Sequence, residues 1–157
     1  MKSAFFTGHR NYSGLNDGIN CLIDFAITQG VNHFYSGMAL GTDLIAAKLL
    51  SDRHLKWTAV IPFWGQTARW SQTQQRQYEQ LLPQATNKIV LYKDYCPQSY
   101  HERNDYMITK SAFCLAVYDG RPEGGTASVI KKVKQLRKNL IVFNPKKGTF
   151  TRQLTIA

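Results

Sequence analysis

The 157-residue sequence has few cysteines and no long hydrophobic run. Its three cysteines, Cys21, Cys96 and Cys114, are far apart, and none belongs to a CxxC pair or has a histidine at the spacing of a zinc site. We therefore expect neither a disulfide framework nor a metal site. No apolar stretch approaches the length of a membrane span, and the N-terminus lacks the pattern of a secretory signal, so we expect a cytoplasmic protein without a membrane partner.

Acidic residues are scarce near the C-terminus. The formal net charge is +10, and the segment after position 130 contains eight basic residues and no acidic one. One interpretation is an amphipathic helix that docks through Val129, Val133 and Leu136 and keeps its lysines in water. The alternative is a nucleic-acid contact. It would use the basic residues of this segment, namely Lys131, Lys132, Lys134, Arg137 and Lys138.

Short apolar segments alternate with helical patterns along the chain. The expected strands are residues 3–7, 33–36, 57–61, 88–92, 113–118 and 140–143. Such alternation is typical of right-handed crossovers and of a mainly parallel sheet covered on both faces. We therefore predict a doubly wound, Rossmann-like, three-layer α/β fold in one domain, residues 1–143. The glutamine-rich segment 65–83 is expected to form an exposed helix, and residues 144–157 to form a tail or a late edge element.

Two glycine-bearing turns follow predicted strands, SGMALGTD at 36–43 and DGRPEGGT at 119–126. Glycines let backbone N–H groups approach an anion closely, and the positive end of the following helix favours negative charge. In doubly wound folds ligands bind outside the carboxyl ends of the strands, where crossovers leave on opposite faces. The two turns therefore predict one nucleotide-like ligand held between them.

Five sequence blocks in a fixed order resemble a known family: TGHR at 7–10, SGMALGTD, PF at 62–63, ERNDYMI at 102–108, and DGRPEGGT. They are similar to the SLOG superfamily, named for the DNA-uptake protein DprA and the LOG enzymes, and most closely to its YpsA/YoqJ-like bacterial and phage branch. The resemblance spans residues 1 to about 143. It implies a Rossmann-like fold that binds nucleotides or nucleotide-derived signals, and it is compatible with a phage or prophage origin.

The resemblance also implies the walls of the site. One wall consists of Gly8, Ser36, Gly37, Gly41 and Asp43, and the other of Arg103, Asn104, Gly124, Gly125 and Thr126. Strand-exit positions add His9, Arg10, Pro62 and Asp119, and Thr42 begins the second helix. Simpler roles stay open for some of these residues. Thr42 is a candidate helix cap with Asp43 in the first turn, His9 a candidate surface residue, and Arg103 a candidate surface partner of Asp105.

Three functions are consistent with these motifs. The first is a sensor or regulator that binds a nucleotide or an ADP-ribose-like ligand, needs no obligatory cofactor, and signals through a protein partner or a homo-oligomer. The second is a LOG-like phosphoribohydrolase. However, the LOG motif PGGxGTxxE places a glutamate where this chain has Val129, which cannot act as a general acid, and Glu123 is the nearest substitute. The third is DprA-like binding of single-stranded DNA through the basic helix and exposed aromatics. The aromatic candidates are Trp64, Trp70, Tyr95 and Tyr100.

Overall fold

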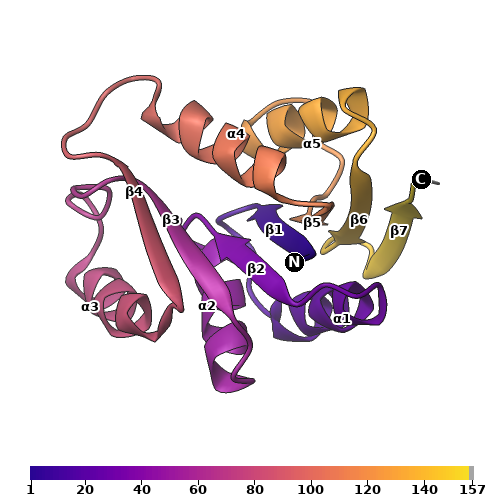
Figure 1. Cartoon of the computed structure of the whole chain (residues 1–157), viewed down its shortest axis with the longest axis horizontal. Helices are drawn as coiled ribbons and strands as arrows, with labels where there is room; N and C mark the ends of the chain where they lie inside the picture. Colours follow the sequence, from indigo (N-terminus) through magenta and orange to yellow (C-terminus); the bar gives the residue numbers. More distant parts are fainter. Residues whose placement is uncertain (156–157) are drawn as a thin grey trace.

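One seven-stranded sheet runs through the whole molecule (Figure 1). The computed structural model describes residues 1–155. The strands are β1 (Ser3–Gly8), β2 (His33–Ser36), β3 (Trp57–Phe63), β4 (Asn87–Tyr92), β5 (Phe113–Val117), β6 (Asn139–Asn144) and β7 (Thr149–Gln153). Their order is β4-β3-β2-β1-β5-β6-β7, and every neighbouring pair is parallel except β6 with β7. The first strand therefore lies at the centre of the sheet, as predicted.

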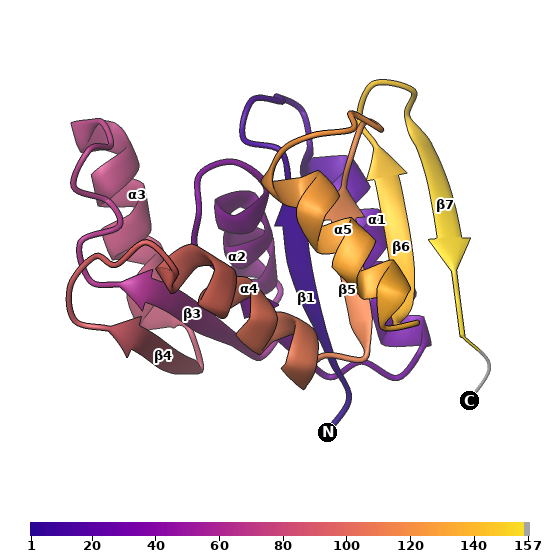
Figure 2. The same cartoon turned by 90° about the horizontal axis from the view of Figure 1, so that it is seen from above.

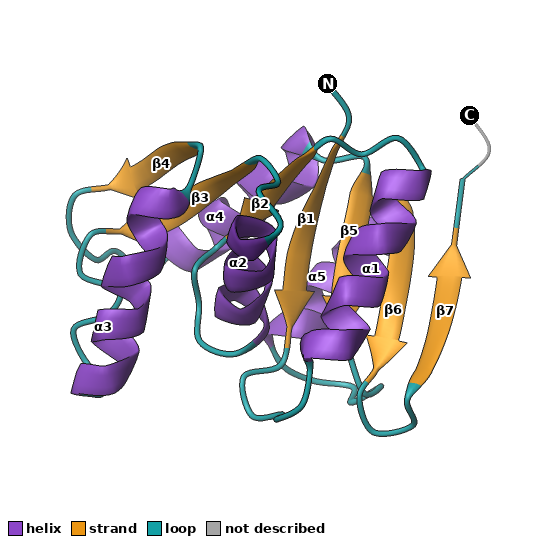
Figure 3. Cartoon of the chain, turned by 90° about the horizontal axis from the view of Figure 1, so that it is seen from below, coloured by secondary structure: helices purple, strands orange, loops and turns teal. Residues whose placement is uncertain are grey.

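Helices cover both faces of this sheet. They are α1 (Asn16–Thr28), α2 (Thr42–Asp52), α3 (Gln72–Leu81), α4 (Ser99–Lys110) and α5 (Gly125–Gln135), with a short 3-10 turn η1 (Leu82–Gln84) after α3. Figure 2 shows α4 and α5 in front of the sheet, and Figure 3, from the opposite side, shows α1, α2 and α3. The predicted doubly wound, three-layer α/β fold is confirmed.

The alternation of side chains along the strands builds one core on each face. In β1, Phe6 belongs to the cluster under α1, α2 and α3, whereas the preceding residue, Phe5, belongs to the cluster under α4 and α5. Successive residues of a strand point to opposite faces, so a strand covered on both sides needs apolar residues throughout. This explains why β3 and β5 are buried along their full length. Each fully buried aliphatic or phenylalanine side chain contributes about 1.5–3 kcal/mol.

Two predicted details at the ends of elements are wrong. β3 continues to Phe63, so Pro62 lies inside the strand rather than after it. Pro62 fits there because β2 ends opposite Ala59, and no neighbouring strand on that side needs the missing N–H. Leu136 caps the C-terminus of α5 and is 53% exposed. The helix docks through Val129, Ile130 and Val133 instead.

Two segments that the sequence left less certain are well defined. Of the segment 65–83, only residues 72–81 form the predicted helix, α3, and residues 65–69 form turns before it. The helix is mostly exposed and is anchored by Tyr78 and Leu81. A capping box at Ser71 and Gln74 begins this helix. Residues 149–153, within the expected tail, form the antiparallel edge strand β7, which pairs with β6 from Leu140 to Asn144. The last two residues of that tail lie outside the described part of the chain.

Candidate functional site

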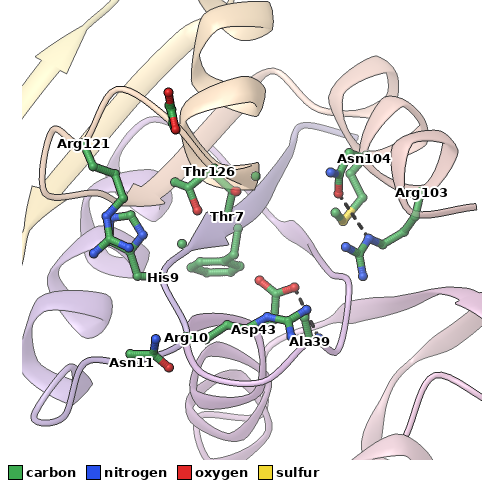
Figure 4. A pocket seen from close by; sticks show the side chains of 16 residues that line it. Thr7, His9, Arg10, Asn11, Ala39, Asp43, Arg103, Asn104, Arg121 and Thr126 are labelled. Carbon is green, nitrogen blue, oxygen red and sulfur yellow. Dashed lines mark hydrogen bonds between the residues drawn. The ribbon is translucent and has the colours of Figure 1, made fainter. Parts of the chain in front are cut away.

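The topology of the sheet places a crevice at the carboxyl ends of β1 and β5. The chain leaves β1 for α1 on one face and leaves β5 for α5 on the other, which is the switch point where ligands bind in open α/β sheets. A cavity of about 290 Å³ lies there (Figure 4). Its lining comes from residues 6–11 at the end of β1 and just after it, from Ala39 before α2 and Asp43 in its first turn, from α4, and from Arg121 and residues 123–126 before and within α5.

Arg103 of α4 supplies a buried positive charge to this crevice. Its Nη1 donates to the carbonyl oxygen of Gly37 at 3.0 Å, and its Nε donates to Asn104 Oδ1 at 3.1 Å. Tyr100 packs against the guanidinium, 5.6 Å from ring centre to Cζ. Burial lowers the pKa of Arg103, and the nearby carboxylate of Asp43 opposes this shift. Among residues 1–155 its Nη2 has no hydrogen-bond partner, so one donor pair remains for a ligand.

Asp43 supplies the opposite charge from the first turn of α2. The only hydrogen bond of its carboxylate within residues 1–155 is a long one, 3.4 Å, accepted by Oδ2 from the N–H of Ala39. Burial raises the pKa of this carboxyl group, and Arg103 partly offsets the shift. Arg103 and Asp43 are each 7% exposed, yet they form no ion pair. Two buried, unpaired opposite charges destabilise a fold, and such arrangements are concentrated at functional sites.

The N-terminus of α5 faces the same crevice. Gly124 is its N-cap, with a φ of 110° that glycine adopts readily, and Gly125 begins the helix. A β-carbon at either glycine would meet no atom within 4 Å, so the space before the first turn is open. The free N–H groups of a first helical turn attract anions, and Thr126 lines the cavity beside them. Among the groups lining the crevice, this helix start is the most suitable for a phosphate.

A charged network fixes the rim of the crevice after β5. The carboxylate of Asp119 accepts from Tyr12 Oη at 2.6 Å and from Arg121 Nη2 at 2.6 Å. These hydrogen bonds, from Arg121 and then Tyr12, hold the pKa of Asp119 well below its usual range. Nε2 of His9 lies 3.1 Å from both the carboxylate and the backbone nitrogen of Asp119. Burial lowers the pKa of His9, with Asp119 opposing, and this favours the neutral ring.

Three predicted glycines serve the packing of the loops rather than the approach of a ligand. A β-carbon at Gly8 would overlap the side chain of Thr42, and one at Gly37 would lie 2.8 Å from Cδ of Arg103. Gly41 has a φ of 82°, and its β-carbon would lie 2.6 Å from Cα of Arg10. Gly8 and Gly41 thus allow the β1 exit to pack against the start of α2, and Gly37 leaves room for Arg103 of α4.

Most of the predicted site residues come together in the crevice. Nine of them line it: Gly8, His9, Arg10, Asp43, Arg103, Asn104, Gly124, Gly125 and Thr126. Those that do not line it are Ser36, Gly37, Gly41 and Thr42, which support it from behind, Asp119, which orients Arg121, and Pro62, which lies within β3. Lining residues absent from the predicted set are Phe6, Thr7, Asn11, Ala39, Met107, Arg121 and Glu123.

Thr42, His9 and Arg103 do not have the simpler roles. Gly41, not Thr42, is the N-cap of α2, and the hydroxyl of Thr42 donates to the carbonyl oxygen of His9 at 3.0 Å. His9 is buried rather than on the surface. Arg103 does not pair with Asp105, because that carboxylate forms an ion pair with Lys132. The position of Met107 beside the crevice could have been predicted from the sequence, because Met107 lies four residues after Arg103 on the same face of α4.

The basic C-terminal region is partly engaged within the protein. Nζ of Lys138 donates to the carbonyl oxygens of Ile108 and Ser111, at 2.6 and 2.8 Å, and so caps the end of α4. Lys132 is paired with Asp105. Lys131, Lys134 and Arg137 remain exposed. Of the aromatic candidates, Trp64, Tyr95 and Tyr100 are exposed, whereas Trp70 packs against Tyr78 with ring centres 5.6 Å apart.

Two features are absent from residues 1–155. No helix in this part of the chain has the length and apolar character needed to cross a membrane. No three side chains of histidine, cysteine, aspartate or glutamate within the same range are grouped as metal ligands would be.

The fold and crevice define a Rossmann-like α/β protein with a candidate site at the switch point. Comparison with known proteins gives the family. Residues 4–143 match the model of the YspA SLOG family, so the protein belongs to that family and the predicted resemblance is confirmed. The chain is 29% identical to the UPF0398 protein YpsA of Bacillus subtilis over 126 residues, covering 76% of this chain and 69% of that protein. It is 32% identical to the SPbeta prophage-derived protein YoqJ of Bacillus subtilis over 128 residues, covering 70% and 75%.

Solved structures agree with the fold. DprA of Streptococcus pneumoniae superposes with a TM-score of 0.68 at 15% identity, over 90% of this chain and 50% of that one. DprA of Helicobacter pylori, described with a single-stranded DNA binding mode, gives 0.66 at 19% identity, over 90% and 64%. The match to a UPF0398 protein of Bacillus velezensis, 28% identical over 71% of this chain, spans 65% of that protein. The chain thus corresponds to part of each of these longer proteins.

Proposed function

We propose that the crevice binds a nucleotide or nucleotide-derived ligand, and that the protein is a binding module whose occupancy is sensed by another protein. The observation that carries this proposal is the buried, unpaired arrangement of Arg103 and Asp43 beside the open N-terminus of α5. A phosphate would accept hydrogen bonds from the first turn of α5 and from the guanidinium. A ribose hydroxyl would donate to Asp43, as an acidic residue does in dinucleotide-binding folds. Such a ligand neutralises the positive charge and satisfies the carboxylate together.

The hydrolase alternative has less support from the geometry. Val129, at the position of the LOG glutamate, packs in the apolar cluster beneath α5 and does not line the crevice. Glu123 does line it, but at an exposed position on the rim. General acid catalysis on a glycosidic bond requires a carboxyl group held against the leaving group. The arrangement therefore favours binding without cleavage.

The test is a binding measurement with a matched control. Isothermal titration with ribose 5-phosphate, AMP and ADP-ribose should give binding to the wild type, accompanied by an increase in melting temperature. The variants Arg103→Met and Thr126→Val should weaken it, whereas Arg53→Met, which removes a surface arginine paired with Asp24, should not. Thr126→Val preserves the shape of the side chain and covers the case in which Arg103→Met unfolds. Equal affinity in the wild type and Thr126→Val, or no binding by any of the three probes, would contradict the proposal.

A further inference from the structure

A second cavity lies next to the crevice, between the N-terminal part of α2 and the exposed helix α3. Its volume is about 430 Å³. The floor is apolar and consists of Leu40, Leu44 and Ile45. The amide side chains of Gln74 and Gln77 lie along the opposite wall. An apolar surface with a few convergent polar groups is the usual character of a site for a small organic molecule.

Arg10 and Asn11 line both this cavity and the crevice, so the two spaces share one partition. The backbone of the partition is held firmly. The N–H of Thr42 donates to the carbonyl oxygen of His9 at 3.3 Å, and the absence of a side chain at Gly41 lets Cα of Arg10 approach closely. The side chain of Arg10, by contrast, has neither a hydrogen bond nor an ion pair within residues 1–155. A fixed backbone with an unpaired guanidinium can contact a ligand that extends over it.

The amides on the far wall are also available. Oε1 of Gln74 accepts from the N–H of Ser71 in the capping box, which leaves the Nε2 of Gln74 as a donor. Gln77 makes no side-chain hydrogen bond within the described chain, so both its donor and its acceptor are free. Neither glutamine lines the crevice itself. Their amides can therefore contact only a part of the ligand that lies beyond Arg10.

We propose that this second cavity binds the heterocyclic base of the nucleotide whose phosphate and ribose lie in the crevice. This inference rests on the proposed function. The flat face of a base would pack on Leu40, Leu44 and Ile45, its polar edge would meet the amides of Gln74 and Gln77, and the guanidinium of Arg10 would stack on it. A purely apolar guest would leave the amides unsatisfied, and a free phosphate would face the apolar floor. A planar ring with a polar edge satisfies both walls.

The experiment compares a probe that has a base with one that lacks it. Ribose 5-phosphate and AMP are titrated into the wild type, Gln77→Ala, Ile45→Glu and the control Gln80→Ala, which removes an exposed amide on the same helix. Loss of an amide contact should weaken AMP about threefold to tenfold in Gln77→Ala, in line with one hydrogen bond. A carboxylate in the apolar floor should weaken AMP about tenfold in Ile45→Glu, because the base would then pack against a charge. Ribose 5-phosphate has no base and should lose no contact in these variants. Its affinity should therefore change less than about twofold, which is below the effect of losing one hydrogen bond.

The outcomes separate the two proposals. If neither probe binds the wild type, the proposed function fails and the base site fails with it. If both probes bind but AMP is unaffected by Ile45→Glu and Gln77→Ala, only the base site is wrong. Equal weakening of both probes in these variants would also overturn the base site, because the effect would then arise in the crevice. Selective loss of AMP, absent in Gln80→Ala, supports it.

Discussion

Nη1 of Arg103 donates a hydrogen bond of 3.0 Å to the carbonyl oxygen of Gly37. This contact joins α4, on one face of the sheet, to the exit of β2, and it holds the guanidinium at the crevice. It also explains the glycine, because the aliphatic part of Arg103 occupies the space where a β-carbon would be.

The variant Gly37→Ala should therefore disturb the site without removing any charge. The new methyl group would lie 2.8 Å from Cδ of Arg103 and force the buried side chain to move. We expect AMP affinity to fall about tenfold, the equivalent of one charge-assisted hydrogen bond, as measured by isothermal titration. Gly65→Ala is the control, since its β-carbon would make only an ordinary contact with Phe63 at 3.6 Å. Unchanged affinity in Gly37→Ala would show that the position of Arg103 does not matter for binding.

Asp43→Asn should stabilise the free protein and weaken ligand binding. Burial raises the pKa of Asp43 above its ordinary value, so the folded state favours the protonated carboxyl group. The stability that this group contributes is present at low pH and is lost as pH rises through the folded pKa. At pH 7, above the ordinary pKa of an aspartate, this buried group therefore destabilises the fold, and a neutral amide removes that cost. An increase in melting temperature of about 2–4 °C would correspond to about 1 kcal/mol for a chain of this size.

The same variant tests the role of Asp43 in binding. An asparagine can still accept a hydrogen bond from a ribose hydroxyl, but it no longer balances Arg103. We expect weaker binding of AMP together with the higher melting temperature, measured on the same sample by titration and differential scanning calorimetry. A variant that is both less stable and unchanged in affinity would place Asp43 in a purely structural role.

The sequence predicted the crevice better than it predicted what each residue does there. Glycines and polar residues at strand exits are visible as motifs, and the topology brings them to one edge because parallel strands end on the same side. The sequence could not show that Gly8 packs against Thr42, or that the carboxylate of Asp119 accepts hydrogen bonds from Arg121. The first is a contact between residues far apart in the sequence, and the second depends on the conformation of the turn after β5. Distance in the sequence also hid the capping role of Lys138, which contacts carbonyl oxygens at the end of α4.

Buried histidines predict a loss of stability in mild acid. Burial lowers the pKa of His9 and of His33, and Lys56 lowers that of His33 further. The unfolded chain therefore takes up protons first as pH falls below about 6.5, so stability is complete above that pH and declines as pH falls towards the folded pKa values. Urea unfolding at pH 7.5, 6.5 and 5.5 (chosen about one unit either side of the unfolded histidine pKa) should show this decline. His33→Gln should reduce the slope and the exposed His101→Gln should not.

Lys138→Met should destabilise the fold although it lies in a basic surface region. Its ammonium group donates to the carbonyl oxygens of Ile108 and Ser111 and, at 3.5 Å, of Thr109, and the variant leaves them without that donor. The expected loss is about 1–2 kcal/mol in the free energy of unfolding, typical of hydrogen bonds to a charged group that is partly exposed to solvent. Lys131→Met, at an exposed position nearby, is the control and should change stability by less than about 0.5 kcal/mol. Equal stability of the two variants would contradict the capping role.

The engagement of Lys132 and Lys138 also limits the binding of single-stranded DNA. Only Lys131, Lys134 and Arg137 of the five basic candidates lack a side-chain partner within residues 1–155. Each phosphate neutralised on a single strand contributes about 0.7 to the slope of log affinity against log salt concentration, so three contacts should give a slope no steeper than about −2.

Fluorescence anisotropy of a labelled oligonucleotide, measured at several salt concentrations, gives this slope for the wild type and for a variant with all three residues changed to alanine. A slope of several units in the wild type that is largely lost in the triple variant would favour a DNA-binding function over the nucleotide-binding one. A weak, shallow dependence, with AMP affinity unaffected by the triple variant, is the expected result, because the charges that bind the nucleotide lie in the crevice and not on this helix.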